Sequence, residues 1–126
     1  MSQKKILLVD DEPNIIKSLN YVLQKKGFAV LCASNGEEAI DRIRSFKPDI
    51  VLLDIMMPKK NGYDVCEEIR KEDNFKNLYI IMLTARGQSI DKEKGLHAGA
   101  NEYMTKPFSP GQILQKIEDI LQKSDK

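Results

Sequence analysis

The sequence predicts an α/β domain built on a doubly wound, five-stranded parallel sheet with helices on both faces. Short apolar runs alternate with amphipathic stretches of helical spacing along the whole chain. The runs are apolar at nearly every position, which is typical of strands that are buried on both faces of a parallel sheet. At 126 residues, the chain fits one such domain and leaves little room for a second.

The first repeat of this pattern is a strand, a helix and a second strand. Residues 6–9 form the first buried strand. Pro13 suits the first turn of the following helix, where its missing N–H costs least, and Gly27 suits the end of that helix. Residues 28–33 are the second strand. The apolar stripe of the helix consists of Ile15, Ile16, Leu19, Val22 and Leu23.

The middle of the chain holds the most apolar strand, residues 50–53, between two helices. Residues 34–36 turn the chain into the first of these helices, and Pro48 ends it. Residues 55–62 form a loop before the second. The stripes of the two helices are Ala39, Ile40, Ile43 and Phe46, and then Val65, Cys66 and Ile69.

Two strands and two helices are expected in the last third. Residues 78–83 form the fourth strand and residues 100–104 a short fifth strand. Residues 89–97 form a weak helix, because Gly95 interrupts it and few of its residues are apolar. Ser109 caps the last helix. Its stripe is Ile113, Leu114, Ile117, Ile120 and Leu121.

Five strand–helix units joined by right-handed crossovers leave few topologies. We expect the flavodoxin-like strand order 2-1-3-4-5. Residues 1–122 form the domain, and residues 123–126 are a polar tail or the start of a linker.

Composition argues against several classes of function. The formal net charge of +1 provides no field for nucleic acid or for an anionic membrane, so direct binding to either is not expected. Cys32 and Cys66 are far apart and form no C-x-x-C pair, which disfavours a disulfide framework or a zinc site. No apolar run reaches membrane-spanning length, and the N-terminus does not resemble a signal peptide, so we expect a cytoplasmic protein.

Polar side chains follow the strands of the predicted sheet. Asp10 and Asp11 end the first strand, Asp54 ends the third, Thr84 ends the fourth and Lys106 follows the fifth. In doubly wound sheets, ligands bind outside the carboxyl ends of the strands, where the strand order reverses. These five side chains should therefore meet at one edge of the sheet.

Each of these residues has an ordinary structural explanation when taken alone. Asp11 could cap a helix, Thr84 could serve a turn, and Lys106 could be a solvated surface lysine. An aspartate that follows residues 50–53 loses hydration unless it finds partners, so Asp54 is harder to explain in this way. Their shared location makes the joint structural explanation weaker than any single one.

The chemistry of this set follows from its charge. Three carboxylates held together raise at least one pKa unless a cation lies among them. Carboxylate, carbonyl and water oxygens suit Mg²⁺, whereas softer metals prefer His or Cys. Mg²⁺, a carboxylate nucleophile, a hydroxyl and a lysine together form a set suited to phosphoryl transfer, and an aspartate can hold the group as an acyl phosphate.

At these residues the chain resembles the receiver domain of two-component response regulators over essentially its whole length. The resemblance depends on four stretches in order. They are Val9-Asp10-Asp11-Glu12, Asp54-Ile55-Met56-Met57-Pro58-Lys59-Lys60-Asn61-Gly62, Leu83-Thr84-Ala85, and Gly99-Ala100-Asn101-Glu102-Tyr103-Met104-Thr105-Lys106-Pro107-Phe108.

The resemblance implies a role for each residue. Asp54 is the phosphoacceptor, and Asp10, Asp11, Asp54 and the backbone carbonyl of Met56 hold Mg²⁺. Thr84 bonds the phosphoryl oxygen, and Tyr103 changes position with it. Lys106 pairs with the phosphoryl group, and Lys106-Pro107 is the cis peptide of the family. Ala85 leaves space beside the phosphate, and the side chains of Met56 and Met57 are expected to serve packing.

The resemblance also implies partners. The phosphoryl group comes from a sensor histidine kinase or a phosphotransfer protein, through its phosphohistidine. The surface around the fourth helix, fifth strand and fifth helix then changes for a downstream effector protein or domain, and a phosphorylation-dependent homodimer is a further option. The domain is expected to assist its own phosphorylation and dephosphorylation. It is not expected to be an enzyme, because it would turn over no external substrate.

The chain departs from the transcription-factor members of that family at two places. Gln112 stands where those members often carry an acid, and Asn101-Glu102 stands where they often carry an acidic pair. His97, the single histidine, is not expected to be a phosphodonor.

Three alternative functions remain. A flavin-binding relative would need a Ser/Thr/Gly phosphate loop after the first strand, where this chain has acids. An aspartate-dependent phosphatase would usually carry a second acid two residues after Asp54, where this chain has Met56. A degenerate receiver that only binds partners is disfavoured, because the set of acids, hydroxyl and lysine is complete.

Overall fold

The computed structural model describes residues 3–57, 59–84, 98–106 and 109–124. Five parallel strands form one sheet in the order β2-β1-β3-β4-β5, which confirms the predicted topology. The strands are β1 (Lys5–Val9), β2 (Ala29–Ala33), β3 (Ile50–Asp54), β4 (Tyr79–Thr84) and β5 (Glu102–Thr105).

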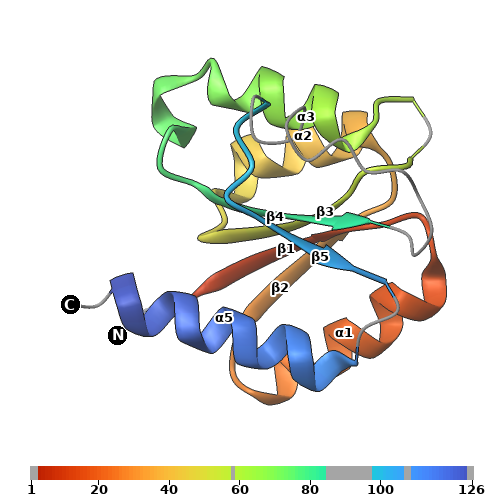
Figure 1. Ribbon diagram of the computed structural model, residues 1–126, viewed down its shortest axis with the longest axis vertical. Helices are drawn as coiled ribbons and strands as arrows, with labels where there is room; N and C mark the ends of the chain where they lie inside the picture. The colour runs from red at the N-terminus through yellow and green to blue at the C-terminus, as the bar shows by residue number, and fades with distance from the viewer. Residues whose placement is uncertain (1–2, 58, 85–97, 107–108, 125–126) are drawn as a thin grey trace.

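Helices cover both faces of the sheet, as predicted (Figure 1). Helices α2 (Gly36–Phe46) and α3 (Gly62–Arg70) lie on one face, and α1 (Pro13–Lys25) and α5 (Pro110–Ser124) lie on the other. A short 3-10 turn, η1 (Asp73–Phe75), follows α3 and was not predicted. The weak helix predicted over residues 89–97 lies outside the described residues.

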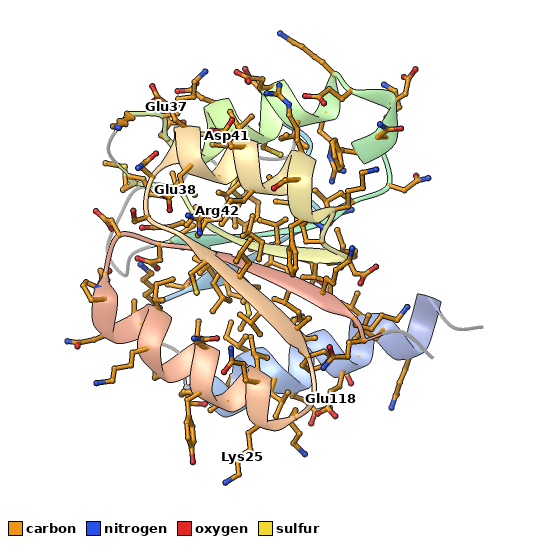
Figure 2. All side chains as sticks on the ribbon, turned by 180° about the vertical axis from the view of Figure 1, so that it is seen from behind. Lys25, Glu37, Glu38, Asp41, Arg42 and Glu118 are labelled. Carbon is orange, nitrogen blue, oxygen red and sulfur yellow. The ribbon has the colours of Figure 1, made fainter. Side chains whose placement is uncertain are left out.

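The alternation of side chains along β3 divides the core into two halves. Val51 and Leu53 pack with α2 and α3, whereas Ile50 and Leu52 pack with α1 and α5. All of β3 is buried, because helices cover both faces of this central strand. The charged side chains of Glu37 and Asp41 on α2 project outward (Figure 2), whereas Arg42 turns toward β2 and donates to the Cys32 carbonyl.

The helix boundaries follow from local chemistry. Pro13 opens α1, and Gly27, with φ of +96°, follows its end as predicted. Ser109 caps α5: its Oγ accepts the Gln112 N–H at 3.1 Å, and Gln112 Oε1 accepts the Ser109 N–H at 2.8 Å. Gln112, which departs from the acid common in transcription-factor relatives, thus completes a capping box. Helix α5 reaches Ser124, two residues into the expected tail at 123–126.

Strand β5 begins at Glu102, later than the predicted start at residue 100. The reason is Asn101, whose side-chain Oδ1 accepts the Ile80 N–H at 2.8 Å. The amide side chain occupies the place of a backbone carbonyl at this point, so the paired register starts with Ile81 and Glu102. Among the described residues, no helix combines the length and apolar character needed to cross a membrane.

Candidate functional site

The predicted acids converge at the carboxyl ends of the central strands. Asp10 and Asp11 directly follow β1, and Asp54 is the last residue of β3. One carboxylate oxygen from each lies within 4.8 Å of the others. Asp10 and Asp54 are buried, at 2% and 5% exposure, and Asp11 is exposed. The crowding of these three carboxylates, expected from the strand-end positions, is confirmed.

Lys106 reaches this acidic cluster from the residue after β5. Its Nζ lies 3.0 Å from Asp10 Oδ2 and 3.6 Å from Asp54 Oδ1. Its backbone N–H donates to the Thr84 carbonyl at 2.6 Å, which fixes the base of the side chain at the end of β4. Two opposing effects act on the pKa of Lys106: burial lowers it, and hydrogen bonds with Glu12 and Asp10 raise it. The hydrogen bonds have the larger effect together, so the pKa is raised and the ammonium stays charged.

Glu12 is a member of the site to which the sequence assigned no role. Its Oε1 accepts a hydrogen bond from Lys106 Nζ at 2.9 Å, which is the shortest of the three carboxylate contacts of that ammonium. Its position directly after the acidic pair was the available signal. A third acid at a helix start is easily taken for a solvated charge.

The surroundings of Asp54 shift the pKa of its carboxyl upward. Burial and the neighbouring Asp10 raise the pKa of Asp54 to about 7, and Asp11 adds to this. The ammonium of Lys106 and a backbone hydrogen bond from Met56 act in the opposite direction. Without a metal ion, the Asp54 carboxyl therefore titrates near neutral pH.

This perturbation predicts a pH-dependent stability. A carboxyl whose pKa is higher in the folded than in the unfolded protein stabilises the fold at low pH, and this contribution is lost as the pH rises through about 7. A rise from near 4 to about 7 corresponds to a free energy on the order of 4 kcal/mol. In EDTA, Asp54→Asn should therefore become increasingly more stable than wild type between about pH 4 and pH 7. Urea unfolding across this range measures the difference, and a constant difference would contradict it.

Thr84 and Tyr103 lie on the two strands next to the acidic cluster. Thr84 is fully buried, and its Oγ1 donates to the Met104 carbonyl at 3.4 Å, a long and weak bond. Tyr103 is half-buried and packs against the core on the α2 and α3 side. The hydroxyl and the ring thus lie on adjacent strands, as expected, and their switching roles stay predictions.

The loop between β3 and α3 is held close to the backbone of Asp54. Gly62 N–H donates to the Ile55 carbonyl at 2.8 Å. A Cβ at Gly62 would lie 2.7 Å from the Asp54 carbonyl oxygen and 2.9 Å from Ile55 Cα. Only a glycine permits this close approach, and in the same loop the Met56 backbone donates a hydrogen bond to Asp54.

Gly62→Ala is expected to destabilise the protein by about 1–3 kcal/mol, because rigid backbone atoms must move to admit the methyl group. Gly111→Ala is the matched control. The added Cβ there meets only Ser109 Oγ at 3.8 Å, and alanine is the better helix former in α5. Urea unfolding should show opposite signs for the two variants. Equal effects would show that the contact at Gly62 is not restrictive.

The described residues suit a hard divalent cation. Asp10 Oδ2 is buried and is not in a well-aligned hydrogen bond within the described part of the chain, although Lys106 Nζ lies 3.0 Å away. Three carboxylates of which two are buried form a hard, oxygen-only donor set. The backbone carbonyl of Met56 stays a predicted ligand.

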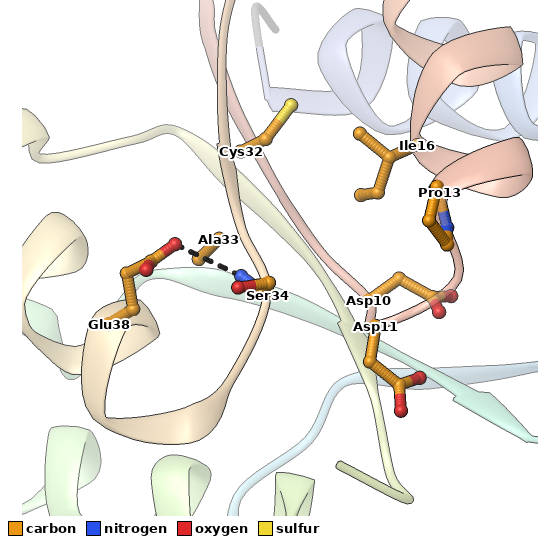
Figure 3. Close-up of a pocket in the computed structure, with 8 residues that line it drawn as sticks. All are labelled: Asp10, Asp11, Pro13, Ile16, Cys32, Ala33, Ser34 and Glu38. Carbon is orange, nitrogen blue, oxygen red and sulfur yellow. Dashed lines mark hydrogen bonds between the residues drawn. The ribbon is translucent and has the colours of Figure 1, made fainter. Parts of the chain in front are cut away.

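A cavity of about 240 Å³ lies beside the acidic pair, between the starts of α1 and α2 (Figure 3). Asp10, Asp11 and Ile16 line one side, and Cys32 lies on β2. The Ser34 N–H donates to Glu38 Oε1 at 3.1 Å on the far side of the cavity.

Both cysteines are free thiols, as expected from their spacing. Burial raises the pKa of Cys32, so its thiol stays protonated. Cys66 is buried.

One predicted detail needs correction, and several others lie outside the described residues. Met57 packs against the core as predicted, but the Met56 side chain is 59% exposed, so its predicted packing role is wrong. Met56 lies in the loop after β3, at the surface of the protein, and its side chain points to solvent. Ala85, His97 and Pro107, and with Pro107 the predicted cis peptide, lie outside the described residues.

Comparison with known proteins places these features in context. The family model described as "Response regulator receiver domain" matches residues 6–118. A solved receiver domain protein from Methanospirillum hungatei JF-1, described as CheY-like, superposes with a TM-score of 0.89 at 30% identity and covers 98% of each chain.

Curated relatives agree with this match. The alkaline phosphatase synthesis transcriptional regulatory protein PhoP of Bacillus subtilis is 45% identical over 97% of this chain and 50% of its own length. The probable transcriptional regulator ycf27 of Porphyra purpurea is 47% identical over 98% of this chain and 50% of its own length. The chain spans about half the length of these curated relatives.

Proposed function

Because this chain belongs to the response regulator receiver domain family, whose members are phosphorylation-activated switches, we propose that Asp54 is its phosphoacceptor and that Mg²⁺ is its cofactor. The observation that carries the proposal is the acidic cluster with Lys106 at its side. A buried carboxylate at the end of β3 faces an ammonium at 3.6 Å and shares a metal-sized space with two further acids.

The proposed reaction is a transfer of one phosphoryl group. An Asp54 carboxylate oxygen forms a bond to phosphorus while the bond from phosphorus to the donor nitrogen breaks, which leaves an acyl phosphate and a neutral imidazole after proton uptake. Lys106, whose Nζ lies 3.6 Å from Asp54 Oδ1, would neutralise charge on the phosphoryl oxygens. A bound Mg²⁺ would supply further neutralisation, held by Asp10, Asp11, Asp54 and the Met56 carbonyl.

The partners follow from the same proposal. A sensor histidine kinase or a phosphotransfer protein supplies the phosphoryl group, and a downstream effector protein or domain reads the changed surface. The named regulators that match this chain are about twice its length, which supports an effector beyond the receiver part in such proteins. A phosphorylation-dependent homodimer remains a second route to output, and the cytoplasmic location stays a prediction.

Under the proposed function, the protein turns over no external substrate. A phosphatase with an aspartate nucleophile would need an acid near the leaving group, and the position two residues after Asp54 carries Met56. Its exposed thioether cannot donate a proton. The domain itself would assist only the formation and hydrolysis of its own acyl phosphate.

Mg²⁺ at about ten times its dissociation constant should raise the melting temperature by about 3–6 °C, because it binds only the native cluster of carboxylates. Thermal melts in Mg²⁺ and in EDTA measure this. Asp11→Asn, which changes the exposed acid, should remove most of the increase. The same preparations treated with acetyl phosphate should take up one phosphoryl group in Mg²⁺ and none in EDTA. Equal uptake in EDTA would overturn the metal-dependent mechanism.

A further inference from the structure

The Lys106 ammonium is closest to an acid that the proposed function does not use. Glu12 Oε1 lies 2.9 Å from Lys106 Nζ, compared with 3.6 Å for Asp54 Oδ1. The Glu12 side chain is 57% exposed and the Lys106 side chain 13% exposed. In the unphosphorylated protein, the ammonium therefore lies nearer to Glu12 and Asp10 than to the acceptor Asp54.

We propose that Glu12 is a positioning residue that holds Lys106 in the unphosphorylated protein and competes for it with the phosphoryl group on Asp54. This inference rests on the proposed function, in which Lys106 contacts that group. It makes Glu12 a determinant of how readily the active state forms.

The backbones of both partners are fixed, so the contact depends on the side chains alone. The Glu12 N–H donates to Asp10 Oδ1 at 2.9 Å, and the Glu12 carbonyl accepts the Ile16 N–H at 3.2 Å at the start of α1. The Lys106 N–H donates to the Thr84 carbonyl at 2.6 Å. Within the described residues, the Glu12 carboxylate makes no capping hydrogen bond to α1, so it is available to the lysine.

The ion pair between Glu12 and Lys106 is weak enough for a phosphoryl group on Asp54 to replace Glu12 as the partner of the lysine. An exposed carboxylate that pairs with an ammonium holds it weakly, because water competes for both charges. A phosphoryl group on Asp54 offers several charged oxygens deeper in the site, where the attraction is less screened. A cation bound at Asp10 would also repel Lys106 from Asp10 Oδ2, which leaves Glu12 as the remaining competitor.

Replacing Glu12 should therefore release Lys106 to the phosphoryl group. With beryllofluoride as the phosphoryl mimic and Mg²⁺ present, Glu12→Gln should bind the mimic about two- to fivefold more tightly than wild type. Lys106→Met should bind it more weakly than wild type. In the Lys106→Met background, Glu12→Gln should have no effect, because the residue acts through the lysine.

The matched control is Glu37→Gln, which removes one exposed carboxylate from the start of α2. Glu37 pairs with Lys59 at 4.0 Å and lies in the first turn of that helix. NMR titrations give the mimic affinities of all these variants. In metal-free protein, the Lys106 ammonium signal should broaden in Glu12→Gln, where its ion pair is lost, and stay sharp in Glu37→Gln.

Several results would overturn the proposal. Equal tightening in the Lys106→Met background, or in Glu37→Gln, would show that Glu12 acts only through its charge. An unchanged Lys106 ammonium signal in Glu12→Gln would show that the contact is absent in solution. A wild-type protein that does not bind beryllofluoride in Mg²⁺ would instead remove the proposed function, and this inference with it.

Discussion

Asp54→Asn is expected to abolish phosphorylation of the domain. An amide is a poor nucleophile, and the other two acids of the cluster follow β1 rather than end β3 beside the Met56 backbone. After incubation with acetyl phosphate and Mg²⁺, wild type should carry one hydroxylamine-sensitive phosphoryl group by intact mass, and the variant should carry none. Hydroxylamine sensitivity identifies an acyl phosphate rather than an ester.

Asp41→Asn is the control for this experiment. Asp41 is an exposed residue on the outward face of α2, and its replacement removes the same charge far from the chemistry (Figure 2). It should be labelled like wild type. A phosphoryl group retained on Asp54→Asn would place the acceptor on another residue, and peptide mapping would identify that residue.

Thr84→Ala is expected to separate binding at the acidic cluster from the response of β5. The Thr84 hydroxyl is bound to the Met104 carbonyl only at 3.4 Å, so a phosphoryl oxygen can draw it away at a cost below about 1 kcal/mol. In wild type, beryllofluoride with Mg²⁺ should shift NMR signals near the acids and also at Tyr103 and Met104. In Thr84→Ala, the shifts at Tyr103 and Met104 should be largely lost.

Thr105→Ala is the matched control, because Thr105 is the register partner of Thr84 on β5 and is exposed. It should keep the full pattern of shifts. Equal shifts at Tyr103 in wild type and Thr84→Ala would show that the hydroxyl does not couple the strands. Wild-type shifts confined to neighbours of Asp10, Asp11 and Asp54 would place the switch somewhere else.

The strands and the strand order were predictable because parallel strands buried on both faces leave continuous apolar runs. The start of β5 was not, since the Asn101 side chain replaces a backbone carbonyl there and leaves no mark on hydrophobic periodicity. The three-residue turn η1 is likewise too short to produce a periodic pattern.

The part of the site that lies at the carboxyl ends of the strands was predictable, because these ends meet at one edge of the sheet. Asp10, Asp54 and Lys106 came together for this topological reason. The contact from Glu12 to Lys106 depends on side-chain reach rather than on strand order, so the sequence identified the acid without its partner. The exposure of Met56 was missed for a similar reason, because a methionine beside a buried strand end gives no sign of which way its side chain points.

The link between Glu12 and Lys106 joins residues 94 positions apart in the chain. A chain interrupted before residue 106 carries all three acids of the cluster but lacks the ammonium that offsets part of their charge. The acidic cluster then stays repulsive and is poorly suited to hold a phosphoryl group. Signalling competence should therefore require the residue that follows β5, and a chain truncated before Lys106 should hold a phosphoryl group poorly.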